Sequence, residues 1–215
     1  MTRLVIIGAG GHGREILDVI EAINAVKPVY EVLGFLDDYE GANEPLSRRS
    51  TGRLGPTSLV ESLDAVYVVA VGNPVARAEI DRRCMLNQRQ SPVLIHPTAT
   101  VGSDVHLASG SVVMAGARIT TNVVAGRHLH VNVNATISHD ARFGDYVTIS
   151  PGCHVSGNVQ LGDGVTLGTG CAIIQGIRIG PHTMVGAGAV VVGDLPGGVT
   201  AVGVPARPLT RKPDN

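Results

Sequence analysis

The chain has 215 residues, enough for one large or two small domains with a substantial buried core. Its 17 Lys and Arg nearly balance its 18 Asp and Glu, so net charge favours neither nucleic acid nor an anionic membrane as a partner. Its three cysteines lack C-x-x-C spacing, which disfavours both a disulfide framework and a structural zinc site. No apolar run approaches the roughly 18 residues of a transmembrane helix. The apolar run in the N-terminal segment MTRLVIIGAGGHG is too short to be the apolar region of a secretory signal. We therefore expect a cytoplasmic protein that binds no metal.

The first 90 residues alternate strand and helix patterns. LVIIGAGGHGREILDVIEAI predicts a buried strand, a glycine turn and a helix with apolar residues at helical spacing. VYEVLGFLDD predicts a second strand that ends at Asp37 and Asp38, and AVYVVAVGN predicts another that ends at Gly72 and Asn73. The alternation indicates a small, Rossmann-like parallel α/β domain over residues 1–90, with ligand-binding loops at the carboxyl ends of its strands.

The glycine turn has the spacing G-x-G-x-x-G at Gly8, Gly10 and Gly13. Such glycines let backbone N–H groups and a helix N-terminus approach a diphosphate. The same spacing also fits a tight turn without a ligand, or an NAD site. A nucleotide sugar is favoured over NAD because the unit is shorter than the six-stranded dinucleotide fold.

A six-residue repeat dominates the second half of the chain. From Ile95 to Val191, each of the 17 positions spaced six residues apart is apolar. Glycine often follows, and the fifth position is small or apolar, which suits short parallel strands joined by tight turns. Three hexads would form a triangular coil of 18 residues, so residues 91–215 predict an all-β parallel β-helix with a C-terminal tail. Cys153 and Cys171, one coil apart at an inward position, are interpreted as core residues.

These motifs resemble known families. The repeats LGDGVT, LGTGCA and IGPHTM, with the ending AVGVPAR, resemble the hexapeptide-repeat acyltransferases of the left-handed β-helix superfamily. GAGGHG, GFLDD and VGNP followed by hexads resemble, over nearly the whole chain, the branch of nucleotide-amino-sugar N-acetyltransferases, such as perosamine N-acetyltransferase, and sialic acid O-acetyltransferase-like proteins. The resemblance alone implies the left hand, because crossovers between parallel strands are normally right-handed. It also implies a homotrimer with acetyl-CoA in the groove between neighbouring prisms.

The resemblance assigns the loops of the first domain to the nucleotide sugar. It implies that Gly10, Gly11 and His12 lie near the diphosphate. It implies that Asp37 and Asp38 lie near the base or ribose, and that Gly72 and Asn73 complete the pocket. His12 could instead be an exposed loop histidine, and the two aspartates a solvated strand end.

The resemblance to acetyltransferases calls for a base that accepts a proton and for donors to the thioester oxygen. His139, in the hexad ISHDAR, lies at a predicted turn and Asp140 follows it. A carboxylate on one imidazole nitrogen would fix the tautomer and leave the other nitrogen as the acceptor. In the family the same His-acid pair, preceded by an Asn such as Asn134, is the catalytic motif. The alternative is a solvated corner histidine.

Acetyl-CoA contacts are also implied by the resemblance. Gly157 lies 18 residues after His139, one coil along on the same side, where its N–H could meet the thioester oxygen. The resemblance places Thr148, Thr169 and Ala187 along the pantetheine and adenosine arms. Relatives have a histidine where this chain has Thr148, which weakens that contact.

The predicted function is transfer of acetyl from acetyl-CoA to the amine of a nucleotide-linked amino sugar. Family likeness favours a 4-amino sugar, such as GDP-perosamine or a UDP-linked one. O-acetylation of sialic acid or another sugar is the nearest alternative, because the same His-Asp pair can act on a hydroxyl. A non-catalytic scaffold or nucleotide-sugar sensor, which would not bind CoA, and an NAD oxidoreductase are further alternatives.

Overall fold

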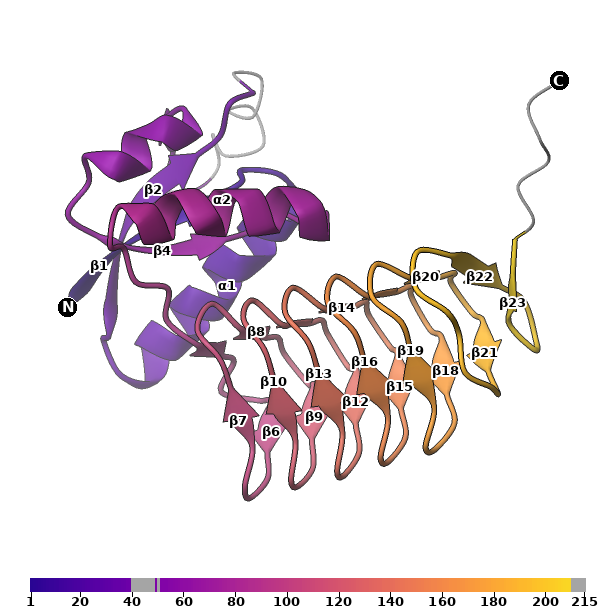
Figure 1. Ribbon diagram of the computed structural model, residues 1–215. Helices are drawn as coiled ribbons and strands as arrows, with labels where there is room; N and C mark the ends of the chain where they lie inside the picture. The colour runs from indigo at the N-terminus through magenta and orange to yellow at the C-terminus, as the bar shows by residue number, and fades with distance from the viewer. Residues whose placement is uncertain (40–48, 50, 210–215) are drawn as a thin grey trace, which may run out of the picture.

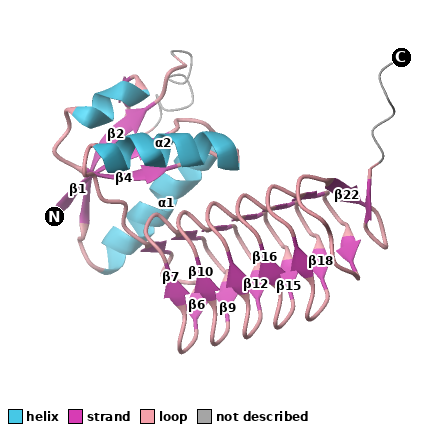
Figure 2. Ribbon diagram, viewed as in Figure 1, coloured by secondary structure: helices cyan, strands magenta, loops and turns pink. Residues whose placement is uncertain are grey.

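The structure is a computed structural model, in which residues 1–39, 49 and 51–209 are described. An α/β unit lies at one end of a long prism of short strands (Figure 1). The described helices all belong to the α/β unit, whereas the prism consists of strands and turns (Figure 2). The tail beyond residue 209 lies outside the described residues.

The α/β unit has a parallel sheet with the strand order β3-β2-β1-β4. Its strands are β1 (Thr2–Ile7), β2 (Tyr30–Leu36), β3 (Arg53–Gly55) and β4 (Val66–Val69). Its helices are α1 (Gly11–Val26), the short 3-10 helix η2 (Thr57–Glu61) and α2 (Pro74–Leu86). The predicted parallel sheet and first helix are confirmed. Strand β3, with three residues, is too short to give a hydrophobic period.

The two α-helices, α1 and α2, cover opposite faces of this sheet. Ile16, Leu17 and Ile20 of α1 are buried in one apolar cluster with Leu4 and Ile6 of β1. The alternate residues of β1 belong to a second cluster, which contains Cys84 of α2. The side-chain period of two in a strand explains why successive residues of β1 face different helices.

The prism has three faces, which the chain visits in the order face 1, face 2, face 3. Face 1 consists of β5 (Leu94–Ile95), β8 (Val112–Val113), β11 (His130–Val131), β14 (Thr148–Ile149), β17 (Thr166–Leu167), β20 (Met184–Val185), β22 (Thr200–Val202) and the antiparallel β23 (Arg207–Pro208). Face 2 consists of β6 (Thr100–Val101), β9 (Arg118–Ile119), β12 (Thr136–Ile137), β15 (His154–Val155), β18 (Ala172–Ile173) and β21 (Val190–Val191). Face 3 consists of β7 (His106–Leu107), β10 (Val124–Ala125), β13 (Arg142–Phe143), β16 (Gln160–Leu161) and β19 (Arg178–Ile179).

The strand register confirms a coil of 18 residues. In face 1, His130 pairs with Thr148 and Val131 pairs with Ile149, and every neighbouring pair of strands from β5 to β21 has the same offset. The interior is filled by Val, Ile, Leu, Ala and the stacked Cys153 and Cys171, as predicted. Ile95 and Val101 in the first coil are each 37% exposed because no earlier coil covers them.

The α/β unit packs on face 1 at the first coils. Leu94, Val112 and Met114 belong to the same buried cluster as the apolar residues of α1. This packing places the loops of the α/β unit beside face 1 and leaves the corner between faces 2 and 3 on the opposite side of the triangle. Among the described residues, no helix has the length and apolar character to cross a membrane.

Candidate active site

His139 and Asp140 form an exposed pair at the corner between faces 2 and 3. The Nδ1 atom of His139 lies 2.7 Å from Oδ2 of Asp140, and each side chain is about half exposed. Adjacent side chains of an extended chain point apart, but Asp140 has a φ of +61°, in the left-handed region. The turn therefore brings the carboxylate back to the imidazole and leaves Nε2 free of that contact.

Asn122, one coil before Asp140 at the same corner, holds the other carboxylate oxygen. Its Nδ2 donates to Oδ1 of Asp140 over 3.2 Å. The hydrogen bonds from His139 and Asn122 lower the pKa of Asp140. The carboxylate thus stays ionised and fixes the orientation of the imidazole. Asn122 is not among the predicted site residues, although the 18-residue period places it one coil before Asp140.

Gly157 lies directly against the imidazole of His139. A Cβ atom at Gly157 would come within 2.5 Å of Cε1 and 2.6 Å of Nε2 of that ring. Gly157 is buried, and no hydrogen-bond partner of its N–H is found among the described residues. The corner therefore combines an oriented imidazole with a backbone donor beside its Nε2 atom.

The glycines of the first loop have two different environments. Gly13 is required for packing, because a Cβ atom there would collide with the carbonyl oxygen of Gly8. Gly10 and Gly11 are exposed at the N-terminus of α1, and a Cβ at Gly10 would meet nothing within 4 Å. A ligand can approach the helix N-terminus at this open position.

Asp37 and Asp38 have partners inside the α/β unit. Asp37 accepts hydrogen bonds from the N–H of Ala9 at 2.7 Å and from the N–H of Tyr39 at 2.8 Å. Asp38 accepts from the N–H and the hydroxyl of Thr57, at 2.8 and 3.0 Å. Both carboxylates thus hold loops at the ligand edge of the sheet.

His12 points toward the prism. Its Nε2 atom lies 3.1 Å from Nδ1 of the buried His130, and its Nδ1 atom lies 3.3 Å from Glu15. Burial lowers the pKa of His12, although Glu15 opposes this shift. Burial, with the nearby Arg77, also lowers the pKa of His130 well below its usual value. Both ring nitrogens of His12 are therefore engaged within the chain.

Gly72 and Asn73 lie at the start of α2, and both are exposed. The Asn73 side chain caps α2 by accepting hydrogen bonds from the N–H groups of Val75 and Ala76, at 2.9 and 3.0 Å. The carbonyl of Gly72 accepts a hydrogen bond from Arg77. This loop and the open glycines lie on the same edge of the sheet, where the parallel strands β1 and β4 end.

The remaining predicted residues do not share the corner of His139. Asn134, Thr169 and Ala187 are exposed at the corner between faces 1 and 2. Thr148 is only 8% exposed in face 1, and its hydroxyl accepts a hydrogen bond from Arg77 at 2.8 Å. Because this hydroxyl is used beneath α2, the geometry gives no support to a contact between Thr148 and CoA.

The predicted site residues therefore fall into three groups within one chain. The loops of the α/β unit lie beside face 1, the group of Asn134 borders face 2 on one side, and His139 borders it on the other. The loops of the α/β unit and His139 are therefore on opposite sides of the prism. In the described part of the chain, no group of three or more His, Cys, Asp or Glu side chains is placed to hold a metal ion.

Comparison with known proteins agrees with both parts of this fold. Residues 3–84 match the PglD N-terminal domain, and residues 140–175 match the bacterial transferase hexapeptide (six repeats). The chain is 31% identical over 151 residues to GDP-perosamine N-acetyltransferase of Escherichia coli O157:H7. That alignment covers 67% of this chain and 66% of the other, just under two thirds of its length.

Solved structures match over almost the full length. The acetyltransferase domain of PglB from Neisseria gonorrhoeae FA1090, in complex with acetyl coenzyme A, is 39% identical with a TM-score of 0.88, and the match covers 97% of this chain and 99% of that one. PerB from Caulobacter crescentus, in complex with CoA and GDP-perosamine, is 30% identical with a TM-score of 0.88, and 98% of each chain is covered. The chain belongs to this family of hexapeptide-repeat acetyltransferases.

Membership of this family confirms the predicted fold class, a small parallel α/β domain followed by a left-handed parallel β-helix. It does not account for the buried charges under α2. Arg77 and Asp81 are both fully buried there, and neither is among the residues predicted from the sequence. Their signal in the sequence is weak, because charged residues on a helix are usually on its solvated face.

Proposed function

We propose that the protein transfers the acetyl group of acetyl-CoA to the amine of a nucleotide-linked amino sugar, with His139 as the general base. The observation that carries this proposal is the oriented pair of His139 and Asp140, with Gly157 against the ring. The general base of such a reaction must lie within hydrogen-bond reach of the attacking group. The His139 side chain is half exposed, and no hydrogen bond of its Nε2 atom is found among the described residues.

The reaction exchanges a C–S bond for a C–N bond and moves one proton from the amine to the sulfur. The sugar nitrogen attacks the thioester carbonyl, a C–N bond forms and the C–S bond breaks. The Nε2 atom of His139 accepts the proton that the amine loses and can return it to the sulfur of the leaving CoA. The N–H of Gly157 would stabilise the negative charge that develops on the carbonyl oxygen. Asp140 would hold the tautomer that leaves Nε2 unprotonated.

We propose that acetyl-CoA lies along the prism in reach of His139 and Gly157, with Thr169 and Ala187 as further contacts. The relatives in complex with acetyl coenzyme A or CoA support CoA as the cosubstrate. Thr148 is left out of the proposed contacts because its hydroxyl is bonded to Arg77. Asn134 is exposed at the same corner as Thr169, so it is proposed there rather than beside His139.

We propose that the domain of residues 1–90 holds the nucleotide sugar at Gly10, Gly11, Gly72 and Asn73. Asp37 and Asp38 would shape this pocket, and His12 would fix its loop on the β-helix. These loops lie across the prism from His139 of the same chain. The acceptor would therefore reach His139 of a second copy, which is why we propose a homotrimer with active sites between neighbouring prisms.

Similarity to enzymes named for GDP-perosamine and UDP-N-acetylbacillosamine supports a nucleotide-linked 4-amino sugar as the acceptor. O-acetylation of sialic acid is the second candidate, because the pair of His139 and Asp140 would activate a hydroxyl in the same way. The choice of nucleotide stays a prediction.

The test is thiol release from acetyl-CoA by the purified protein, with UDP-, GDP- and dTDP-linked 3- and 4-amino sugars and with free sialic acid. We expect rapid release with one nucleotide amino sugar, and mass spectrometry should show one acetyl group on its amine. Release with sialic acid alone would replace the proposal with O-acetylation. If none of these acceptors causes thiol release and the protein does not bind CoA, a non-catalytic scaffold would be the better explanation.

A further inference from the structure

The helix α2 presents two buried charges to the β-helix, one turn apart. Arg77 and Asp81 are both 0% exposed, although charged side chains are almost never fully buried without compensation. Each charge has partners on both sides of the junction between the α/β unit and the β-helix. The proposed reaction assigns neither residue a contact with a substrate.

Arg77 joins the loop after β4 to the β-helix through a single guanidinium group. Its Nη1 atom donates to the carbonyls of Val71 at 2.7 Å and Gly72 at 3.1 Å. Its Nη2 atom donates to the carbonyl of Tyr146 at 2.7 Å and to the hydroxyl of Thr148 at 2.8 Å. The planar guanidinium has fixed donor directions, so these bonds set the loop and the coil at one distance and one angle.

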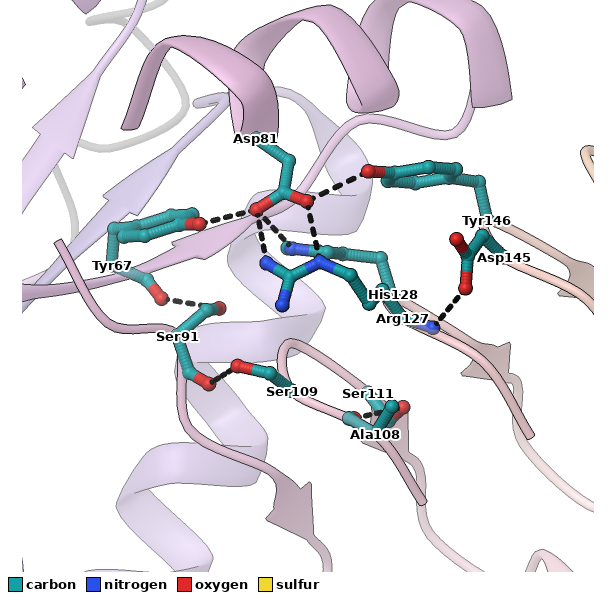
Figure 3. A network of polar contacts seen from close by, with 10 residues as sticks. All are labelled: Tyr67, Asp81, Ser91, Ala108, Ser109, Ser111, Arg127, His128, Asp145 and Tyr146. Carbon is teal, nitrogen blue, oxygen red and sulfur yellow. Dashed lines mark hydrogen bonds and ion pairs between the residues drawn. The ribbon is translucent and has the colours of Figure 1, made fainter. Parts of the chain in front are cut away.

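Asp81 forms a second connection, shown at the centre of Figure 3. It accepts two hydrogen bonds from Arg127, at 2.8 and 3.0 Å, and one from the hydroxyl of Tyr146 at 2.8 Å. It also pairs with His128 at 2.8 Å and accepts a hydrogen bond from the hydroxyl of Tyr67 on β4. Arg127, His128 and Tyr146 come from two successive coils at the corner between faces 3 and 1.

Stability alone does not explain the charge of Arg77. Its hydrogen-bond acceptors are neutral carbonyls and a hydroxyl, and burial lowers its pKa to about 10. A well-packed apolar side chain is often as stabilising as a buried ion, whereas the ion specifies one geometry. The fixed geometry is therefore the property that the buried guanidinium supplies.

Arg77 also contacts the β-helix at the same height along the prism as His139, which lies at the corner between faces 2 and 3. Thr148 pairs with His130 in face 1, and His139 lies between these two residues in the same coil. In a cyclic assembly whose axis is parallel to the prisms, a given level of one prism faces the same level of its neighbour. The loop of residues 71–73, which Arg77 fixes at the height of Thr148, would then lie at the height of His139 in the neighbouring copy.

We propose that Arg77 is a positioning residue: it fixes residues 71–73, at the proposed acceptor pocket, to the coil that carries His139, and so sets where the acceptor amine meets the base. The proposal rests on the proposed function and adds a determinant of acceptor placement to it. Arg77 touches neither the acceptor nor CoA in this scheme. Asp81 supports it by holding the next turn of α2 on Tyr146, which Arg77 also contacts, and on Arg127 and His128 of the preceding coil.

The test compares Arg77→Met with Arg82→Met, which removes an exposed arginine from the same helix. Misplacement of a reacting group by about 1 Å can reduce rates about 100-fold, so we expect Arg77→Met to lower kcat/KM for the acceptor roughly 10- to 100-fold. The KM for the acceptor should rise, while the KM for acetyl-CoA should stay within about twofold of wild type. Arg77→Lys, which keeps the charge without the planar fork, should recover part of the loss.

A purely structural role for Arg77 would give another result. It would lower the active fraction, measured by the stoichiometry of CoA binding, and leave the acceptor KM unchanged, which would overturn the proposal. If Arg77→Met does not fold, Thr148→Val removes one of the four hydrogen-bond acceptors and should raise the acceptor KM in the same direction. An unchanged acceptor KM in that variant would also count against it.

Hydrogen exchange separates this inference from the proposed function. If the wild-type protein acetylates no amino sugar, the proposed function fails, but the connection made by Arg77 can still be measured. The backbone N–H groups of Val71, Gly72 and Asn73, and of Val75 and Ala76 after Pro74, should exchange faster in Arg77→Met than in Arg82→Met and wild type. Equal exchange in all three proteins would show that Arg77 does not hold the loop.

Discussion

The Nδ1 atom of His139 lies 2.7 Å from Oδ2 of Asp140, although the two residues are adjacent in the chain. The positive φ of Asp140 makes this contact possible, and Asn122 holds the second oxygen of the same carboxylate. The imidazole is thus oriented by residues of two coils before any substrate binds. Preorganisation of this kind is what a general base at an exposed corner requires.

Replacement of His139 by Asn should remove the proposed general base and leave the β-helix intact. We expect kcat to fall roughly 100- to 10,000-fold, the usual range for loss of a general base, with little change in CoA affinity. His106→Asn is the matched control, because His106 is also exposed and lies 2.9 Å from an aspartate, Asp104. Near wild-type turnover of the His139 variant would refute the assignment of the base.

Gly157→Ala should move the imidazole of His139 rather than disrupt the fold. The added Cβ would lie within 2.6 Å of two ring atoms, and a half-exposed side chain can rotate away from it. We expect a kcat about 10- to 100-fold lower with an almost unchanged melting temperature. Gly193→Ala is the control, because it lies two coils further along the same corner and its Cβ would meet nothing within 4 Å. Equal activity of the two variants would contradict the close contact of Gly157 with the ring.

Asp81→Asn should destabilise the junction in a pH-dependent way. Burial alone would raise the pKa of Asp81, but the hydrogen bonds from His128, Arg127 and Tyr67 hold it well below its usual value. Because the pKa is lower in the folded protein, the stabilisation is complete above the unfolded pKa of about 4 and declines as the pH falls toward the folded value. We expect the variant to lose about 3–5 kcal/mol at pH 7, since Asp81 is fully buried and its loss leaves the partly buried Arg127 without its charged partner.

Urea unfolding followed by circular dichroism at pH 7 and pH 3 measures this difference. The gap between wild type and Asp81→Asn should be smaller at pH 3, because part of the wild-type stabilisation is then lost. Glu79→Gln on the exposed side of the same helix should show only a small gap at either pH. A gap for Asp81→Asn that widens toward low pH would contradict the lowered pKa.

Two alanine substitutions in the glycine turn should have opposite consequences. Gly13→Ala would bring a Cβ against the carbonyl of Gly8, so the variant should lose more than about 3 kcal/mol despite the better helix propensity of alanine. Gly10→Ala has open space and should keep the wild-type stability. If Gly10 lies beside the nucleotide sugar, its variant should bind the acceptor more weakly. Unchanged acceptor binding would remove Gly10 from the proposed pocket.

The three thiols should be unreactive in the native protein. Cys84, Cys153 and Cys171 are all buried. Burial raises the pKa of the Cys84 thiol to about 12, and the contact with Cys153, together with burial, raises the pKa of Cys171. A thiol-specific reagent should therefore label none of them until denaturant is added, after which it should label all three. One equivalent of rapid labelling in the native state would contradict the burial of these side chains.

The sequence by itself determined the β-helix and the location of the candidate base. The apolar six-residue period is repeated in every coil, so the same contact recurs between residues 18 apart and leaves a regular signal in the chain. The same period predicts that Gly157 follows His139 along one corner, where the structure has it. The left hand of the helix came from family resemblance, because periodicity carries no information about handedness.

Only the tertiary structure decided how the two units meet. The contacts of Asp81 with Arg127 and of His12 with His130 join residues 46 and 118 positions apart, and each occurs once in the chain. A contact made once leaves no period, so neither pattern nor propensity predicts it. The same docking buries Thr148 under Arg77 and places the loops of the α/β unit across the prism from His139. These features depend on how two surfaces fit together, and a one-dimensional sequence pattern does not encode that fit.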